Sequence, residues 1–381
     1  ISRRVLAAPA AESAPCVSLH LAADSPLPPL TVAADDMQTL LRKAGIVGLG
    51  GGAFPAWRKY RPQSQLLLIN AVASDDKIHG DRALLSHHAA TLSATAAQVA
   101  AAMGVPSVII ALRDDAPTIS KAEGPVRVVR VTADYAMGSE RLLIRHLCQR
   151  AIPPDEFPAD HGILCFNLGT VLAIAAAIDQ GIAMTGRIIT VRSPANEVIN
   201  VRVPFGVAMG TLAAFAGISP AAKFCVGEGR EWLSAEAIIC AQTTVADFAA
   251  AAADAISPCI RCGACLPICP VDLSPLQLYA LWQDGGDGME ENGIAACLLC
   301  RRCDEQCPSN IPLAATFAAA QRSFAARRAK AQQASRWQKR HGQHLQRVAA
   351  TPPLATVSAA DQAAAAMRQA KAKRQAALSG D

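Results

Sequence analysis

Apolar and polar positions alternate along the first half of the chain in a way that predicts strands and helices in turn. Short apolar runs with the length of buried strands lie at 66–69, 107–112 and 127–131. Longer stretches with helical character lie at 35–44, 82–103 and 139–150. Strand–helix alternation of this kind favours an open α/β sheet, and we expect a nucleotide-binding-like domain over residues 36–160.

Residues 161–245 follow a different pattern. A Gly/Ala-rich helix at 168–180 precedes two alternating runs at 187–191 and 198–203, which the turn residues Ser193-Pro194 separate. Alternation around a turn predicts a β-hairpin, so we expect a small α+β module here. The Ala-rich stretch 245–256 predicts a helix that Pro258 ends.

The two ends of the chain differ in composition from its body. Residues 1–35 mix short apolar pieces with prolines, and we interpret them as the remnant of a β-rich unit. Residues 246–320 hold most of the cysteines and form a further expected domain. Residues 321–381 hold 12 Lys/Arg and 2 Asp/Glu, a net charge of +10, and predict a basic tail that is helical or partly disordered.

Composition excludes some classes of protein. The chain has 381 residues and is 51% hydrophobic, which is enough apolar material for folded cores. The longest apolar stretches, 88–112 and 203–222, are interrupted by Gly, Pro and polar residues, so neither predicts a membrane span. The start of the chain does not predict a signal peptide, and the paired cysteine spacing indicates a reducing compartment.

The strongest chemical signal is a cysteine motif that occurs twice. The first copy is Cys259-Ile-Arg-Cys262-Gly-Ala-Cys265-Leu-Pro-Ile-Cys269-Pro270, and the second is Cys297-Leu-Leu-Cys300-Arg-Arg-Cys303-Asp-Glu-Gln-Cys307-Pro308. Both have the spacing C-x2-C-x2-C-x3-C-P, in which three cysteines bind one cubane [4Fe–4S] cluster and the fourth binds the other. We therefore expect one cluster on Cys259, Cys262, Cys265 and Cys307, and the other on Cys269, Cys297, Cys300 and Cys303.

Zinc is the alternative for these cysteines. Structural zinc prefers two separated Cys/His pairs, which two runs of four cysteines match poorly. A zinc module would make the chain a non-enzymatic protein with a nucleic-acid-binding tail. The tail offers only Phe324 and Trp337 for base stacking, so we expect no nucleic-acid partner. The other five cysteines, Cys16, Cys148, Cys165, Cys225 and Cys240, are expected to be small buried apolar residues.

A glycine-rich segment precedes Lys59. Gly48, Gly50, Gly51 and Gly52 would let backbone N–H groups approach an anion closely, and Lys59 would add a positive charge. A tight structural turn uses the same residue types, and the segment lacks the strict dinucleotide-binding spacing. Phosphate binding and a structural turn are both open at this point.

Together, the loop and the cysteine motifs resemble the RnfC/RsxC family of the Rnf/Rsx ion-translocating electron-transport complexes. The similar segments are Gly48–Pro55, Asn167–Thr170, Cys259–Tyr279, Cys307–Leu313 and the tail at 362–375. That family shares its α/β flavin fold and a β-grasp-like module with the NADH- and FMN-binding subunit of respiratory complex I. The resemblance identifies the candidate flavin-site residues as Gly48, Gly50, Gly51, Gly52, Lys59, Asp75 and Glu140.

The same resemblance implies an NADH-linked translocating oxidoreductase that acts as part of a complex. Electrons would pass from NADH, through FMN and two [4Fe–4S] clusters, to the other subunits of an Rnf/Rsx-type complex. The chain would then contact the cytoplasmic face of the bacterial inner membrane peripherally, and a basic tail suits anionic headgroups or an acidic partner.

The flavin region departs from the family pattern. The order of Gly and Ala at positions 52 and 53 is exchanged, and Ala73 stands where the family has an acidic residue. These departures support an alternative function, in which the chain is an electron-relay and scaffold subunit with a degenerate flavin site.

Overall fold

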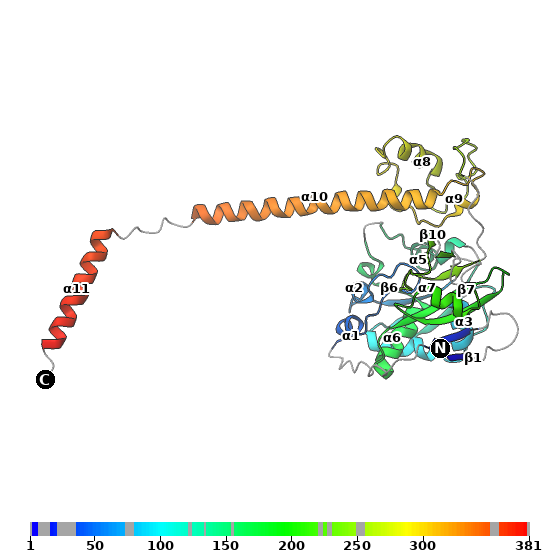
Figure 1. Cartoon of the computed structure of the whole chain (residues 1–381), viewed down its shortest axis with the longest axis horizontal. Coiled ribbons are helices and arrows are strands. Elements are labelled where there is room, and N and C mark those ends of the chain that lie inside the picture. Colours follow the sequence, from blue (N-terminus) through cyan, green and yellow to red (C-terminus); the bar gives the residue numbers. More distant parts are fainter. Residues whose placement is uncertain are drawn as a thin grey trace. The chain divides into compact units, whose positions relative to one another are not determined.

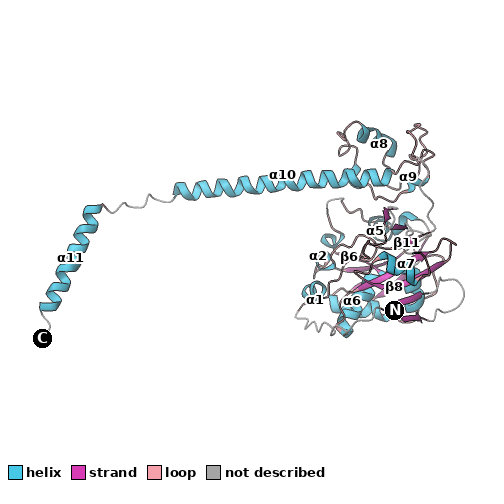
Figure 2. Cartoon of the chain, viewed as in Figure 1, coloured by secondary structure: helices cyan, strands magenta, loops and turns pink. Residues whose placement is uncertain are grey.

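The computed structural model divides into two compact units, residues 1–321 and 322–381. It describes residues 2–6, 16–20, 36–72, 80–120, 124–132, 135–153, 156–219, 224–226, 231–248, 256–350 and 358–378. Within these residues no helix is long and apolar enough to cross a membrane. Figures 1 and 2 show the helices and strands of the chain.

The expected parallel sheet is present. It has the order β5-β4-β3-β6, and all three of its pairings are parallel. Its strands are β3 (Leu66–Ala71), β4 (Ser107–Arg113), β5 (Val126–Val131) and β6 (Ile163–Asn167). The border expected at residue 160 is wrong, because β6 pairs with β3 and therefore belongs to this sheet.

Helices cover both faces of this sheet. One core lies against α1 (Met37–Lys43), α3 (Gly80–His88), α4 (Leu92–Met103) and α6 (Leu168–Gln180). A second core, on the opposite face, holds the apolar side of α5 (Glu140–Cys148). Alternate strand residues divide between the cores, since Leu67 and Ile69 lie in the first and Leu68 in the second.

The helix expected over 82–103 is two helices, α3 and α4. The chain turns between them, where the backbone carbonyl of Ala89 accepts a hydrogen bond from Ser120 N at 2.9 Å. This bond comes from a segment outside the helices, so the apolar periodicity of 82–103 gave no sign of it.

The second sheet has seven strands in the order β1-β2-β8-β7-β11-β9-β10. They are β1 (Ser2–Leu6), β2 (Cys16–His20), β7 (Gly186–Arg192), β8 (Val198–Pro204), β9 (Phe224–Val226), β10 (Glu231–Leu233) and β11 (Val245–Asp247). The β7–β8 hairpin is antiparallel, as its pattern predicts. Helix α7 (Met209–Phe215) packs against this sheet.

Two expectations about this region are wrong. Strands β1 and β2 do not form a unit of their own, because β2 pairs in parallel with β8. The Ala-rich stretch predicted as a helix begins instead with strand β11, which pairs with β7. Residues 249–255 of that stretch lie outside the described residues. Pairing with a neighbouring strand overrides the helical preference of alanine.

The cysteine-rich part has little regular structure. It contains α8 (Pro275–Gln283), a 3-10 turn at Ile294–Ala296, α9 (Arg302–Glu305) and the start of α10 (Leu313–Ala350). Its small core includes Leu278, Met289, Ile294, Ile311 and Phe317. Short helix α2 (Ala56–Lys59) follows the glycine-rich loop of the α/β part.

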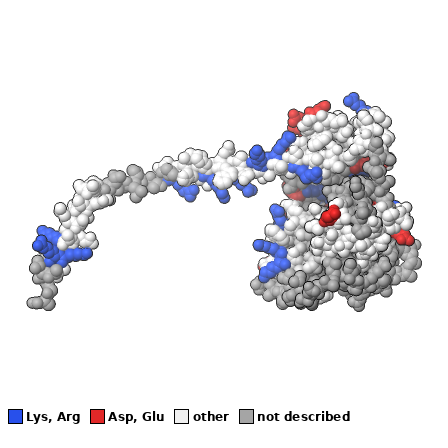
Figure 3. Space-filling model, viewed as in Figure 1, with Lys and Arg blue, Asp and Glu red and all other residues white. Residues whose placement is uncertain are grey.

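The second unit is helical. It contains most of α10 and all of α11 (Ala359–Leu378). Almost every described side chain from 325 to 347 is exposed, and that stretch holds Lys and Arg but no Asp or Glu. Figure 3 shows Lys and Arg atoms along both helices.

Candidate flavin cavity and cysteine hollows

A cavity of about 720 Å³ opens at the carboxyl ends of strands β3 and β6, and we call it the main cavity. Its lining includes Asn70 near the end of β3, Asn167 at the end of β6 and the glycine-rich loop. The carboxyl edge of a parallel sheet is the usual place for a ligand in α/β folds. A volume of this size falls within the range that small-molecule sites occupy.

The glycine-rich loop forms one wall of this cavity. Gly48, Gly50 and Gly52 line it, whereas Gly51 lies within the loop without lining the cavity. Gly51 has a φ of 101°, which favours glycine. Ala53 has a φ of 45°, so a residue with a side chain occupies a left-handed position at which the related family has glycine.

Hydrogen bonds within the loop and from two other elements, α6 and β7, hold the loop in place. Leu49 N donates to Thr170 Oγ1 at 2.9 Å, and Gly48 N donates to the carbonyl of Phe54 at 2.9 Å. The guanidinium of Arg187, in β7 of the second sheet, donates to the carbonyl of Leu49 at 2.8 Å and also to that of Ala241. The second sheet therefore helps to fix the loop on the first.

Lys59 and Glu140 form an ion pair at the main cavity. Lys59 Nζ lies 2.7 Å from Glu140 Oε2 and also donates to the carbonyl of Cys165 at 3.3 Å. The second carboxylate oxygen of Glu140 is buried and has no hydrogen-bond partner among the described residues. Thr244 Oγ1, also at the cavity, is likewise buried without a hydrogen-bond partner among the described residues. Unsatisfied buried polar atoms beside a cavity fit a polar ligand.

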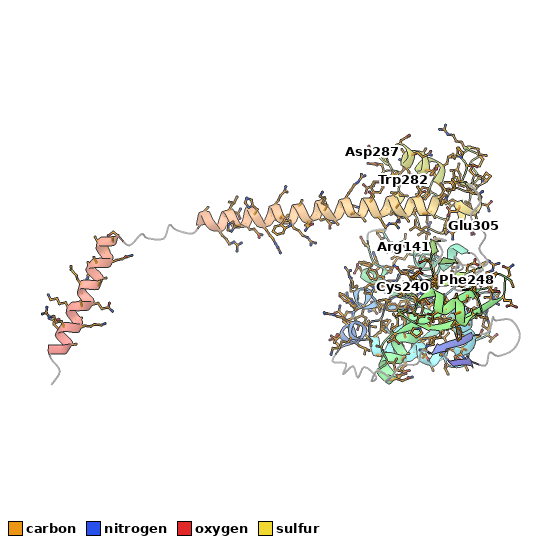
Figure 4. All side chains as sticks on the ribbon, viewed as in Figure 1. Arg141, Cys240, Phe248, Trp282, Asp287 and Glu305 are labelled. Atoms are coloured by element: carbon orange, nitrogen blue, oxygen red, sulfur yellow. The ribbon has the colours of Figure 1, made fainter. Side chains whose placement is uncertain are left out.

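Helix α5 presents Glu140 from a fixed position. The adjacent Arg141, labelled in Figure 4, donates to the carbonyls of Ile152 and Pro153 at 2.9 Å and 2.6 Å. Asn70 Nδ2 donates to the carbonyl of Gly138 at 2.8 Å, which ties the turn before α5 to the end of β3. The charged wall of the cavity is therefore held by bonds to backbone on both sides.

Two buried charged groups lie next to the cavity. Burial raises the pKa of the Asp81 carboxyl above its ordinary value, although a 2.6 Å hydrogen bond from Asn167 and the charge of Arg187 oppose this shift. Burial lowers the pKa of Arg187 to about 10. Sequence reasoning missed Arg187. Its position in β7, in register with buried Ile189 and Val191, was the available signal.

The eight motif cysteines surround two small hollows. Cys259, Cys262, Cys265 and Cys307 line one of them, which we call the first hollow. Cys269, Cys297, Cys300 and Cys303 line the second hollow. The structure thus brings the fourth cysteine of each motif together with the first three of the other motif, in the grouping that the spacing predicts.

The two loops that surround these hollows have the same backbone path. Arg261 and Leu299, one residue before the second cysteine of each loop, both have a φ of 56°. Gly263 and Arg301, one residue after it, are also left-handed. The matching torsions indicate an internal repeat, which suits two like clusters.

Thiols in these hollows are poorly placed to ionise without a cation. Burial raises the pKa of Cys297 to about 11 and raises that of Cys303 further. Iron ions supply the positive charge that four neighbouring thiolates need. A cubane binds each of its four thiolates through a different iron, which suits four cysteines around one hollow.

The second hollow also borders the main cavity. Residues 295–300, which include Cys297 and Cys300, line the main cavity together with Gly50, Lys59 and Glu140. Sequence reasoning did not predict this shared wall, because it joins segments more than a hundred residues apart. Of the candidate flavin-site residues, Asp75 lies outside the described residues.

Two protein-family models match the parts of the chain that form the cavity and the hollows. Residues 41–176 match the Nuo51 FMN-binding domain, and residues 255–311 match the 4Fe-4S dicluster domain. These matches confirm the expectation of iron–sulfur clusters and of an FMN-type domain. The β-grasp-like description of the second module stays a prediction.

Individual relatives agree with the resemblance. The chain is 32% identical over 263 residues to the RnfC-type subunit of the ion-translocating oxidoreductase complex of Pseudomonas aeruginosa, covering 63% of this chain and 34% of that protein. It is 27% identical to the corresponding subunit of Buchnera aphidicola, covering 73% and 63% of the two chains. It is also 31% identical to cobalamin reductase PduS of Salmonella typhimurium, covering 49% and 43%.

These matches cover less than two thirds of each relative's own length. A solved NAD+-reducing [NiFe]-hydrogenase is similar with a TM-score of 0.45 and 20% identity, covering 55% of this chain and 46% of that one. The expected resemblance to the RnfC/RsxC family is confirmed by the several members of that family among the relatives.

Proposed function

We propose that this chain, a relative of the RnfC-type subunits of ion-translocating oxidoreductase complexes, is an electron-relay subunit. It would take electrons from NADH at a flavin in the main cavity and pass them through two [4Fe–4S] clusters to membrane partners. One observation carries the proposal: the flavin-type cavity and the second hollow share residues 295–300 as a wall. An electron donor in the cavity would lie beside the first acceptor.

The residues of the cavity support FMN as the bound flavin. Gly50 and Gly52, which line the cavity, would offer backbone N–H groups to a phosphate, and Lys59 Nζ offers a positive charge near them. A Cβ at Gly52 would meet nothing within 4 Å, so the loop leaves open space on that side. A flavin accepts electrons in pairs from a nicotinamide and releases them singly, which suits a neighbouring cluster.

The residues of the two hollows support the predicted cluster ligands. Cys259, Cys262, Cys265 and Cys307 would hold one cluster, and Cys269, Cys297, Cys300 and Cys303 the other. The Leu273 amide donates to Cys269 Sγ at 3.3 Å, a contact that stabilises a ligating thiolate. Such clusters exchange single electrons.

Anaerobic purification tests this function. The protein should carry about eight iron atoms, as two cubanes require, together with FMN, and its absorbance should bleach on addition of NADH. Iron without any flavin or response to NADH would contradict the flavin site. Zinc in place of iron would contradict the relay altogether and favour a zinc module.

A relay and scaffold subunit without a flavin is the second candidate. It is favoured by Ala53, which has a φ of 45° in the glycine-rich loop, and by Lys59, whose charge Glu140 already partly neutralises. In that case the double variant Ala53→Gly with Ala73→Glu should gain affinity for FMN. A native protein already saturated with FMN would refute this candidate.

Location at the cytoplasmic face of the inner membrane, with other members of the complex as partners, is part of the proposal. The support comes from the relatives' membership of ion-translocating complexes and from the exposed basic residues of α10 and α11. Anionic lipid headgroups attract such residues.

A further inference from the structure

Large apolar side chains are exposed around one of the two cysteine loops. Ile256 is 62% exposed, Ile260 is 67% exposed and Leu266 is 41% exposed. All three belong to the segment 256–266, which also supplies three cysteines of the first hollow. We call this segment the first-loop face. Several exposed apolar residues within one short segment are typical of a surface that another protein covers.

A cluster ligand lies within this face. Cys262 is exposed, whereas every cysteine of the second hollow is half-buried. A redox group that is bound there would lie close to the outer surface of the protein. Another protein could approach this group directly. An electron leaving it would not have to cross the core of the chain.

Because the two cysteine loops have the same backbone path, residues at matching positions in them can be compared. Ile260 follows the first cysteine of its loop, and Leu298 holds the same position in the other loop. Leu298 is half-buried and lines the main cavity, while Ile260 is exposed. The second loop covers its apolar residue with the cavity wall, and the first loop has no corresponding cover among the described residues.

We propose that the first-loop face is where a membrane-bound electron acceptor docks. This inference rests on the proposed relay function and assigns the two clusters different places in it. The cluster of the second hollow faces the main cavity, and the cluster of the first hollow faces the partner. The electron leaves through the side of the chain that carries Cys262.

The chemistry of the partner follows from the face. One electron passes from the reduced cluster to a one-electron acceptor on the partner, so one group is oxidised and the other reduced, and no bond is made or broken. Arg261 is the only charged residue between 256 and 271, and it is exposed. The complementary surface is therefore apolar around the acceptor and acidic opposite Arg261.

The test measures electron exit alone. The full chain is purified anaerobically, checked for iron and reduced with dithionite. It is then mixed with membranes of the source organism from which this chain has been deleted. The variants are Ile256→Glu and Leu266→Glu, because neither residue lines the first hollow. A third variant, Ile238→Glu, is the control, since Ile238 is 64% exposed but lies in the second sheet region.

The membranes should reoxidise the two loop variants at least about tenfold more slowly than the wild type, as loss of a central apolar contact predicts. Their reoxidation by ferricyanide, which needs no docking, should equal that of the wild type. Ile238→Glu should match the wild type with both acceptors. The variant Arg261→Gln should also slow the reaction with membranes and weaken its dependence on salt.

Loop variants that react with membranes at the wild-type rate would overturn the inference, and so would a wild-type protein that the membranes do not reoxidise. Because dithionite replaces NADH, a failed flavin site leaves this experiment unaffected. A protein without iron would refute the relay function itself before docking is tested.

Discussion

The exchanged residues of the glycine-rich loop allow a test of the loop's conformation. Ala53 has a φ of 45°, and glycine is the residue that adopts this region without strain. The variant Ala53→Gly restores the residue that the related family has at this position. We expect it to stabilise the α/β part of the chain.

The magnitude follows from two opposing effects. A left-handed backbone costs an L-residue about 1–2 kcal/mol, and Ala53→Gly removes that cost. Glycine loses about 0.5–1 kcal/mol more than alanine does when it is ordered. Taking the middle of each range, the net gain in the free energy of unfolding is about 0.75 kcal/mol.

Neighbouring glycines provide matched controls with different expected signs. Gly52 is not left-handed, and a Cβ there meets nothing within 4 Å, so Gly52→Ala should stabilise by about 0.4–1 kcal/mol. Gly51 has a φ of 101°, so Gly51→Ala should destabilise by about 1 kcal/mol or more. The double variant with Gly52→Ala and Ala53→Gly should add the two gains approximately.

Urea unfolding measures these differences when the fluorescence of a single tryptophan follows the unfolding of the α/β part. Trp57 packs against the core of the parallel sheet, so the remaining tryptophans, Trp232, Trp282 and Trp337, are replaced by Phe in every protein compared. At a slope of about 2 kcal/mol per M, Ala53→Gly should raise the midpoint by about 0.4 M. A lower midpoint for Ala53→Gly, or a higher one for Gly51→Ala, would refute the backbone conformation described for the loop.

Four further predictions concern charge. Lys59→Gln should lower the affinity for FMN about tenfold or more, as loss of a charged hydrogen bond predicts, and flavin titration of the apoprotein measures this. The pKa of Asp81 is raised by burial, so the folded state holds the proton more tightly than the unfolded chain does. The free energy of unfolding of the wild type, relative to Asp81→Asn, should therefore fall as the pH rises from about 4 towards 7, which urea titrations at each pH would reveal. Asp304→Asn should raise the potential of the cluster in the second hollow and leave the first unchanged in an EPR-monitored redox titration. Asp304 lies beside Cys303, and an amide oxygen can still accept the 2.8 Å bond from Ala314 N. Replacing the Lys and Arg residues between 322 and 374 by Gln should abolish co-sedimentation with anionic vesicles at low salt, since each contributes about 1 kcal/mol near such a surface. Unchanged co-sedimentation would exclude the tail as the lipid contact.

Local patterns were enough to predict the parallel sheet. The strands at 66–69, 107–112 and 127–131 carry apolar runs of the right length, and all are present with small shifts of their ends. Strand β11 was missed because its three residues continue into an alanine-rich stretch. Its pairing with β7 depends on a strand more than fifty residues earlier, which the local pattern does not encode.

The cysteine groups were predictable for a chemical reason. In the spacing C-x2-C-x2-C-x3-C, the first three cysteines bind one cubane and the fourth binds the other, so the spacing alone suggested which cysteines meet. The glycine-rich loop was recognisable from the same kind of local pattern. In both cases the pattern that makes the prediction is local, although the fourth cysteine of each group comes from the other motif.

Arg187 shows why the rest of the site could not be predicted. It lies in the second sheet, but its guanidinium holds the carbonyl of Leu49 in the loop of the first. In the sequence it is only a charged residue at the start of an apolar strand. A buried arginine needs acceptors, and here the carbonyls of Leu49 and Ala241 supply them. Removing its side chain would therefore disturb the glycine-rich loop although Arg187 belongs to neither predicted motif.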